Sequence, residues 1–242
     1  MYLAYKTDVG KTRDINQDTV KAGFIDENIA VAVVCDGMGG AKSGEVASSV
    51  AADLIYKRII SGFNEKMKPN SIRNLMLTSV HAANTIVNEK SKEDIDKNGM
   101  GTTCVAALAD EKNLYIVSVG DSRAYLLQKN KIEQITTDHT YVQMLFDEGI
   151  ITKEEQKNHK LKNVITRALG VEPDVEVDYF ELELKENYSL LLCTDGLSNF
   201  CSEETMYETV FEKDLQDAVV NLVNIANKNG GSDNITVAVI AN

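Results

Sequence analysis

Two aspartates that follow apolar runs are the first candidates for chemistry. Asp36 comes after the run 31–35 and precedes three glycines, and Asp195 comes after a second run and precedes Gly196. Glycines let the backbone turn sharply and approach a ligand closely. A carboxylate at the tip of a buried strand is costly unless a cation meets it, so the two acids could share a metal site. The alternative for either Asp-Gly pair alone is an ordinary strand-to-turn junction.

Two further acids also lie at the edges of apolar runs. Asp121 follows one such run, and Asp233 precedes the last one in the chain. Both could therefore point toward the same place as the first two acids. Arg123 lies two residues after Asp121 and is an alternative, purely structural ion-pair partner for it.

A polar segment near the start of the chain contains Arg13 and Asp18. One interpretation is a solvated loop, since exposed loops are usually polar. The other gives Arg13 an anion to bind in bidentate fashion and places Asp18 beside a metal.

The five candidate acids offer only oxygen ligands, and no Cys/His cluster accompanies them. Oxygen-only ligation favours Mg²⁺ or Mn²⁺ over Zn²⁺. Two such ions about 3.5–4 Å apart can share a bridging hydroxide and stabilise in-line attack on phosphorus. Without metal, repulsion among the acids is expected to raise some of their pKa values. Arg13 would then hold the phosphate oxygens, a role that lysine fills less well.

The acids must be positioned by strands and helices, which the spacing of apolar residues predicts. The predicted strands are 1–8, 19–25, 28–36, 102–109, 113–119, 124–127, 175–184, 188–195 and 232–240; the predicted helices are about 43–59, 71–88, 203–211 and 214–228. Antiparallel strands in two blocks, each followed by a helix pair, predict an α+β fold. We expect a four-layer α-β-β-α sandwich of two packed antiparallel sheets flanked by helix pairs.

Residues 139–165 are predicted to form a surface flap. The segment is polar, with a helical pattern in its first part, and Thr152 and Glu155 have the spacing of a capping box. It also contains His139 and His159, which we interpret as structural or exposed residues.

Composition limits the functional classes. The chain has 242 residues, 25 Lys and Arg against 37 Asp and Glu, and a net charge of −12, which argues against binding to nucleic acid or anionic membranes. No apolar run approaches the length of a membrane span, and the N-terminus does not resemble a signal peptide. Only two prolines and no linker favour one domain over 1–242, with a monomer as the default. Four cysteines without C-x-x-C spacing favour buried thiols and a cytoplasmic setting.

Six short motifs follow one another along essentially the whole chain. They are Arg13 with Asn16-Gln17-Asp18, Asp36-Gly37-Met38-Gly39-Gly40, Gly101-Thr102-Thr103, Gly120-Asp121-Ser122-Arg123, Thr194-Asp195-Gly196 and Ser232-Asp233-Asn234. Each motif alone is weak, but the ordered set resembles the metal-dependent protein phosphatases of type 2C, and more narrowly their compact bacterial serine/threonine branch. That family has a β-sandwich between helix pairs, which agrees with the predicted fold.

The resemblance implies hydrolysis of phosphoserine and phosphothreonine in proteins by a metal-bridging hydroxide, with no covalent phosphoenzyme. Asp36 would bridge two core Mn²⁺ or Mg²⁺ ions, and the carbonyl of Gly37 would bind one of them. Asp195 and Asp233 would bind the other ion, and Asp18 would hold metal-bound waters.

The resemblance also implies a third, weaker metal site formed by Asp121 and Asp195. The partners would be phosphorylated proteins, namely the substrates of a cognate bacterial serine/threonine kinase.

Two positions depart from the family pattern. Met38 stands where eukaryotic relatives have a histidine, the expected general acid, and a methionine cannot donate a proton. The general acid is therefore unassigned, with a metal-bound water as the alternative. Ala41 stands where many bacterial relatives have a histidine, so any role of that side chain is absent.

Other classes fit less well. An aspartate-nucleophile phosphatase needs an acid at the position of Met38, a cysteine phosphatase needs a C-x₅-R sequence, and an EF-hand needs alternating oxygen ligands. A non-catalytic phosphoprotein-binding module on the same fold is a second hypothesis, but its expected signature is a lost acid, and none is lost. A phosphatase of a sigma-factor switch is a third, and Arg13 with the 16–18 segment favours the general branch over it.

Overall fold

A computed structural model describes residues 1–39, 43–93, 99–184 and 187–242. Gly40 and Ala41 of the glycine-rich motif lie outside the described residues. The strands are β1 (Tyr2–Asp8), β2 (Asp18–Asp26), β3 (Ile29–Met38), β4 (Gly101–Thr102), β5 (Cys104–Ala109), β6 (Asn113–Val119), β7 (Arg123–Gln128), β8 (Lys131–Gln134), β9 (Asp178–Glu183), β10 (Ser189–Cys193) and β11 (Ile235–Ala241). The helices are α1 (Ser43–Gly62), α2 (Pro69–Glu93), α3 (Tyr141–Asp147), α4 (Lys153–Asn158), α5 (Asp195–Ser198), α6 (Glu203–Glu212) and α7 (Leu215–Lys228).

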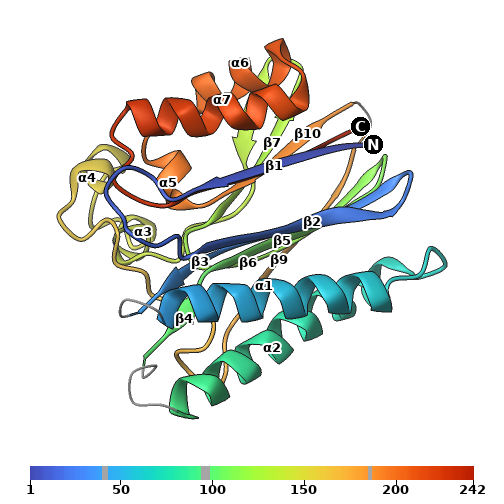
Figure 1. Cartoon of the computed structure of the whole chain (residues 1–242), viewed down its shortest axis with the longest axis horizontal. Helices are drawn as coiled ribbons and strands as arrows, with labels where there is room; N and C mark the ends of the chain where they lie inside the picture. The colour runs from blue at the N-terminus through green and yellow to red at the C-terminus, as the bar shows by residue number, and fades with distance from the viewer. Residues whose placement is uncertain (40–42, 94–98, 185–186) are drawn as a thin grey trace.

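The strands form two antiparallel sheets that pack face to face. One sheet has the order β1-β11-β10-β7-β8, and the other has the order β2-β3-β5-β6-β9, with β4 paired to β3. Figure 1 shows α6 and α7 over the outer face of the first sheet and α1 and α2 over the outer face of the second. The predicted four-layer α+β sandwich is therefore confirmed.

Sheet membership does not follow the two blocks of the sequence. The first strand, β1, pairs along its whole length with the last strand, β11, from Tyr2 opposite Ala241 to Asp8 opposite Ile235. Both termini consequently lie at one end of the sandwich, and α3, α4 and α5 lie at the other end (Figure 1).

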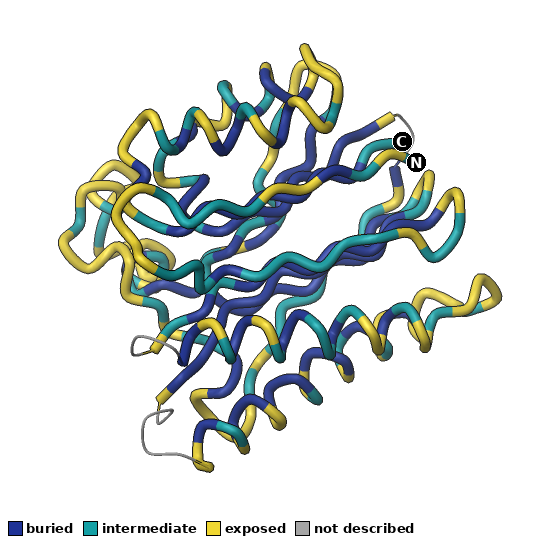
Figure 2. The backbone as a smooth tube through the Cα atoms, viewed as in Figure 1, coloured by how far each residue is buried: buried dark blue, intermediate teal, exposed yellow. Residues whose placement is uncertain are grey.

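Alternation along β3 explains its continuous apolar run. Val31, Val33 and Cys35 pack against the helices α1 and α2, whereas Ala32 and Val34 face the other sheet. Successive side chains of a strand point to opposite faces of the sheet. A strand that lies between a second sheet and a helix layer is therefore buried on both faces. Figure 2 shows the same burial in the neighbouring central strands, with exposed residues on the outer sides of the helices.

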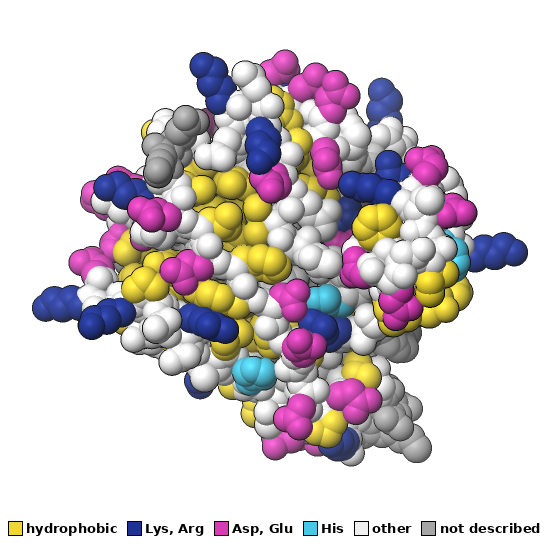
Figure 3. Space-filling view, turned by 180° about the vertical axis from the view of Figure 1, so that it is seen from behind, with side chains coloured by type: hydrophobic (Ala, Val, Ile, Leu, Met, Phe, Trp, Pro, Cys, Tyr) yellow, Lys and Arg dark blue, Asp and Glu magenta, His cyan; other side chains and the backbone are white. Residues whose placement is uncertain are grey.

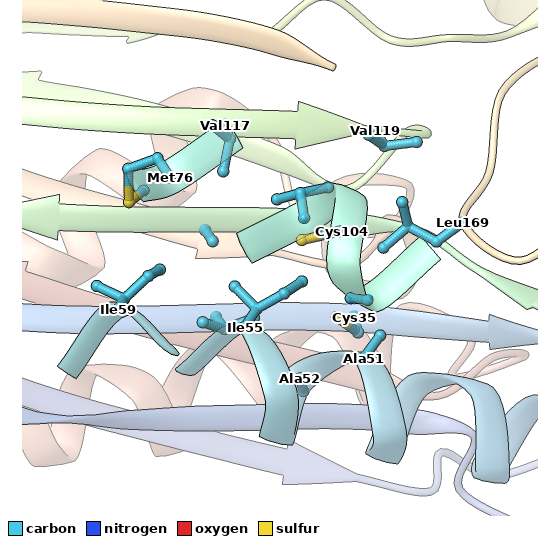
Figure 4. Packing of buried hydrophobic residues seen from close by; sticks show 14 of the residues in the cluster. Cys35, Ala51, Ala52, Ile55, Ile59, Met76, Cys104, Val117, Val119 and Leu169 are labelled. Atoms are coloured by element: carbon cyan, nitrogen blue, oxygen red, sulfur yellow. The ribbon is translucent and has the colours of Figure 1, made fainter. Parts of the chain in front are cut away.

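The layer between α1 and its sheet is built from small and branched side chains. Figure 4 shows Ala51, Ala52, Ile55 and Ile59 of α1 in one row, with Ala51 beside Cys35. All four cysteines of the chain are buried free thiols, which agrees with the expectation drawn from their spacing.

Several element boundaries differ from the predictions. The strand β3 does not end at Asp36 but continues to Met38, because Gly37 and Met38 pair with the short strand β4. The elements β8 and α5 were not predicted, since four residues are too few to show a period. The predicted strand 175–184 is β9, which begins only at Asp178.

The segment between β8 and β9 contains the two short helices α3 and α4. Helix α4 begins with a complete capping box, in which Thr152 and Glu155 bond each other's backbone N–H groups. This confirms the spacing signal of those two residues.

The surface carries charges of both signs. On the face seen in Figure 3, acidic and basic side chains are interspersed around a hydrophobic area. This face lacks the continuous basic area that is typical of nucleic-acid binding proteins. Within the described part of the chain, no helix combines the length and the apolar composition needed to cross a bilayer.

The helix–sheet layer leads to a prediction about stability. Ile55 is fully buried, so Ile55→Ala is expected to lower the free energy of unfolding by about 2–5 kcal/mol through lost burial and a cavity. Ile86→Ala, on the exposed side of α2, is the control and should lower it by about 1 kcal/mol or less. Urea unfolding followed by circular dichroism measures both, and equal losses would contradict the assigned core.

Candidate metal centre

Asp18 and Asp36 form a cross-strand pair of acids. They are register partners in β2 and β3, and such partners share one face of a sheet. Alternation places Asp36 on the same side as Val34, toward the other sheet. The two carboxylates therefore lie where the apolar layer between the sheets ends.

The opposite sheet supplies a hydroxyl to this pair. Thr194, which follows β10, donates a buried hydrogen bond of 2.8 Å from Oγ1 to Oδ2 of Asp18. The position of Thr194 is held by Thr236, because its N–H donates to the Thr236 carbonyl and its Oγ1 accepts from the Thr236 N–H. The next residue, Asp195, is the first of α5, and its Oδ2 accepts from Asn199.

The N-terminal loop is attached to the start of β11 by Asn234. Its Oδ1 accepts from the N–H of Gln17 at 2.8 Å, and its Nδ2 donates to the carbonyls of Val9 and Ile15. The loop therefore brings Arg13, whose side chain is half exposed, next to Asp233.

Arg13 and Asp233 form a two-pronged ion pair. Nη2 lies 3.0 Å from Oδ2, and Nε lies 3.0 Å from Oδ1. The guanidinium thus engages a carboxylate in the fork geometry that also suits a phosphate group.

Gly37 is required by a close approach of three backbone segments. A Cβ atom there would lie 2.0 Å from the carbonyl oxygen of Gly44 in α1 and 2.7 Å from that of Gln17. The N–H of Gly37 donates to Gln17 at 3.0 Å. The turn after Asp36 is thereby fixed against both α1 and the N-terminal loop.

Thr103 connects Asp36 to the turn that carries Asp121. Its Oγ1 accepts from the N–H of Asp36 at 2.9 Å and lies 2.7 Å from Oγ of Ser122. Gly120 has a φ of +100° and lies against the Thr103 side chain. A Cβ atom on residue 120 would lie 2.6 Å from Cγ2 of Thr103.

Two side chains near Asp121 have structural roles. Arg123 does not pair with Asp121; its Nε and Nη2 bind Asp138 instead, at distances down to 2.6 Å. His139 is buried, and its Nδ1 accepts from the N–H of Gly120 at 3.0 Å, which agrees with the structural interpretation of this residue.

Burial and mutual repulsion dominate the electrostatics. Burial, with the charges of Asp195 and Asp233 added, raises the pKa of Asp18 to about 7 against the opposing hydrogen bonds. Burial and neighbouring carboxylates raise the pKa of Asp121 to about 7 and that of Asp195 to about 6.

The pKa of Asp36 is affected by all four of the other acids. Burial raises the pKa of Asp36 well above its usual range, and the charges of Asp18, Asp195, Asp121 and Asp233 raise it further. The acids that the sequence singled out thus lie near one another, two from β2 and β3, one from the start of α5 and two from loops.

The site fits a divalent cation in chemistry and charge. The Oδ1 atoms of Asp18 and Asp195 are buried and accept no hydrogen bond from the described residues. Buried carboxylates of this kind call for a positive partner, and oxygen donors suit Mg²⁺ and Mn²⁺. In residues 1–39, 43–93, 99–184 and 187–242, however, no three His, Cys, Asp or Glu side chains yet converge into a coordination group.

Comparison with known proteins places the chain in a family. The family model for protein phosphatase 2C matches residues 11–236. The chain belongs to the protein phosphatase 2C family. Members of this family are metal-dependent serine/threonine protein phosphatases, and this chain is such an enzyme.

Relatives of this phosphatase agree along the whole chain. The serine/threonine phosphatase stp of Listeria monocytogenes is 37% identical over 244 residues, which cover 99% of this chain and 95% of that protein. The crystal structure of the serine/threonine phosphatase Stp1 from Staphylococcus aureus superposes with a TM-score of 0.91 at 35% identity, covering 99% of this chain and 94% of that one. The catalytic domain of PstP in complex with two manganese ions has a TM-score of 0.84 at 34% identity, covering 98% and 96%.

Sequence reasoning assigned no role to several residues that support the acids of this phosphatase. Thr194, Thr103 and Asn234 hold Asp18, Asp36 and the Arg13 loop through hydrogen bonds. All three belong to the recognised motifs, so a polar residue beside a candidate acid was the available signal. Their partners lie far away in the sequence and could not be read from it.

The raised pKa values predict how the metal-free phosphatase responds to pH. The folded pKa values of Asp18 and Asp121 are about 7, whereas unfolded aspartates titrate near about 3.9. The folded state therefore binds more protons between these values, and stability should fall as pH rises from about 4 to about 7. Urea unfolding in EDTA measures this fall.

Asp18→Asn should reduce the fall in the free energy of unfolding between about pH 4 and about pH 7 by about 2–4 kcal/mol, because it removes one buried ionisable group. The control Asp217→Asn, on the exposed side of α7, should keep the wild-type slope. A wild-type stability that rises over this pH interval in EDTA would contradict the predicted charge repulsion.

Proposed function

We propose that this site hydrolyses phosphoserine and phosphothreonine in proteins with the help of Mn²⁺ or Mg²⁺. The observation that carries the proposal is the cross-strand pair of Asp18 and Asp36, in which Asp18 is bonded by Thr194, the residue before Asp195. Arg13 pairs with one of the five acids, Asp233, and Arg123 is bound by Asp138. Among the described residues, the other four carboxylates of the group have no ion-pair partner. The missing positive charge is what a pair of divalent cations would supply.

We assign the core metal ligands as the resemblance implies. Asp36 would lie between the two ions, the Gly37 carbonyl would bind one, and Asp195 and Asp233 would bind the other. The unpartnered Oδ1 of Asp195 supports this assignment, as do the two manganese ions of the related PstP domain. When bound, such ions neutralise phosphate charge and activate water for attack on phosphorus.

Asp18 and Asp121 are assigned to outer roles. Thr194 holds one oxygen of Asp18 and leaves the buried Oδ1 free, which suits a carboxylate that positions water molecules. Asp121 and Asp195 line the same cavity, and the charge of Asp195 raises the pKa of Asp121. We propose a third, weaker metal site between these two acids.

Arg13 would bind the substrate phosphate. Its fork already engages two carboxylate oxygens of Asp233, and its loop is anchored by Asn234. A phosphate group presents equivalent oxygens, so it can compete for the same donors once Asp233 turns to a metal. We do not assign the general acid that protonates the leaving group. Met38 has no ionisable proton to donate, and Nδ1 of His139 already accepts a hydrogen bond from the N–H of Gly120.

The biological setting follows from the same proposal. Phosphorylated proteins are the substrates, and we expect a cognate serine/threonine kinase to produce them. We propose that the chain acts in the cytoplasm, since its thiols are buried and unbridged. A monomer is the default state. We also propose that 1–242 is one catalytic domain with a flap at 139–165, because strands from both ends of the chain share one sheet.

Hydrolysis of a phosphothreonine peptide tests the proposed function. Turnover should require added Mn²⁺ or Mg²⁺ and disappear in EDTA, and Asp36→Asn should lower kcat by at least about 100-fold because it removes the central ligand. Asp217→Asn is the matched control and should keep full activity. Mn²⁺ binding without turnover of any phosphopeptide by the wild type would favour the binding-module alternative instead.

Substitution of Arg13 tests its phosphate-binding role. Arg13→Ala should lower kcat/KM for the peptide by about 10–100-fold, because charge-assisted hydrogen bonds to the phosphate are lost. Arg13→Lys should recover only part of this loss, since an ammonium cannot form the two-pronged contact. A lower kcat/KM in steady-state kinetics, together with an unchanged Mn²⁺ affinity, would distinguish phosphate binding from metal binding. Full activity of Arg13→Ala would refute the phosphate-binding role.

A further inference from the structure

A cavity of about 820 Å³ opens beside the acids and extends away from them. Asp121 and Asp195 line its inner end, and it continues between the helices α3 and α4 on one side and α6 on the other. Figure 1 places α3, α4 and α5 together at this end of the sandwich. Its volume lies in the range of ligand sites and exceeds what a phosphoryl group alone needs.

Besides the two acids and the Arg123–Asp138 ion pair, two further groups of charged side chains line this cavity. Lys153, Lys157 and Lys162 line it from the flap, and Glu203 and Glu204 line it from α6. Within the described residues, none of the three lysines is in an ion pair with a carboxylate of the chain. The flap side is thus a locally basic wall in a protein whose net charge is −12.

The arrangement of two of these lysines is unfavourable for the helix itself. Lys153 and Lys157 are four residues apart in α4 and so lie on the same side of a six-residue helix. Like charges at this spacing repel and destabilise a helix. An anionic group between them and Lys162 would remove the repulsion.

The basic wall is held in place by the rest of the flap. Gln156 of α4 donates to Oε1 of Gln143 in α3 at 2.8 Å, and the N–H of Tyr141 donates to Val164 at 2.8 Å. The capping box of Thr152 fixes the first turn of α4, which contains Lys153. The lysines therefore stand on a framework and do not depend on a partner for their place along the cavity.

We propose that this cavity is a second substrate subsite, which binds an acidic peptide segment next to the phosphorylated serine or threonine. The inference rests on the proposed function, because the acids at the inner end must hold the phosphorylated residue. The three lysines attract Asp or Glu side chains of the substrate, and Glu203 and Glu204 repel the same side chains from the opposite wall. The subsite thus selects phosphoproteins by the charge of the flanking sequence.

Kinetics on three substrates tests the subsite. Lys157→Glu should lower kcat/KM about fivefold for a phosphothreonine peptide flanked by glutamates, mainly through KM, and raise it for an arginine-flanked peptide. Turnover of p-nitrophenyl phosphate, which is too small to reach the flap from the acids, should change much less. Lys160→Glu is the matched control, because Lys160 is exposed in the same segment but does not line the cavity.

The outcomes separate the subsite from the proposed function. Loss for the acidic peptide in Lys157→Glu alone supports the subsite. Equal effects in both variants, or equal effects on all three substrates, would overturn it while the phosphatase activity stands. Absence of wild-type turnover on every substrate would instead refute the proposed function, and the subsite with it.

Discussion

The interaction on which this structure depends is the repulsion among carboxylates that the fold forces together. Asp18 and Asp36 face each other across β2 and β3, and Asp195 and Asp233 approach from the opposite sheet. Burial makes their charges expensive, and in the described part of the chain only Asp233 is paired with an arginine. A bound divalent cation would relieve this repulsion, which is why we propose that the group is the metal site. The remaining layers of the fold hold its residues in place.

The supporting contacts position the acids without cancelling their charge. Thr194, Thr103 and Asn234 are neutral donors and acceptors, and each ties an acid or its loop to a different strand. Neutral hydrogen bonds orient a carboxylate but leave its net charge for a ligand. The close packing at Gly37 has the same effect, because it fixes the backbone beside Asp36 while adding no side chain.

The acids that we propose for catalysis and the flap that we propose for substrate selection lie in different parts of the fold. Asp18 and Asp36 lie on neighbouring strands, and the other three acids lie just beyond strand ends or before a strand begins. The proposed flap lies at the end of the sandwich with α3 and α4 and is mostly exposed (Figure 2). Rigid strands suit groups whose distances decide the reaction, and surface segments can vary without disturbing the core. The cavity beginning at Asp121 and Asp195 joins the two regions, so the flap can influence which phosphoprotein reaches the acids.

The sequence by itself determined the two antiparallel sheets, the flanking helices and the set of acids, because apolar periodicity and the ordered motifs are local signals. It also predicted the capping box of Thr152. Tertiary structure alone decided that β1 pairs with β11, that β3 continues to Met38 on β4, and that Arg123 binds Asp138. Such pairings join residues distant in sequence, and they depend on packing and charge in three dimensions, which no local pattern contains.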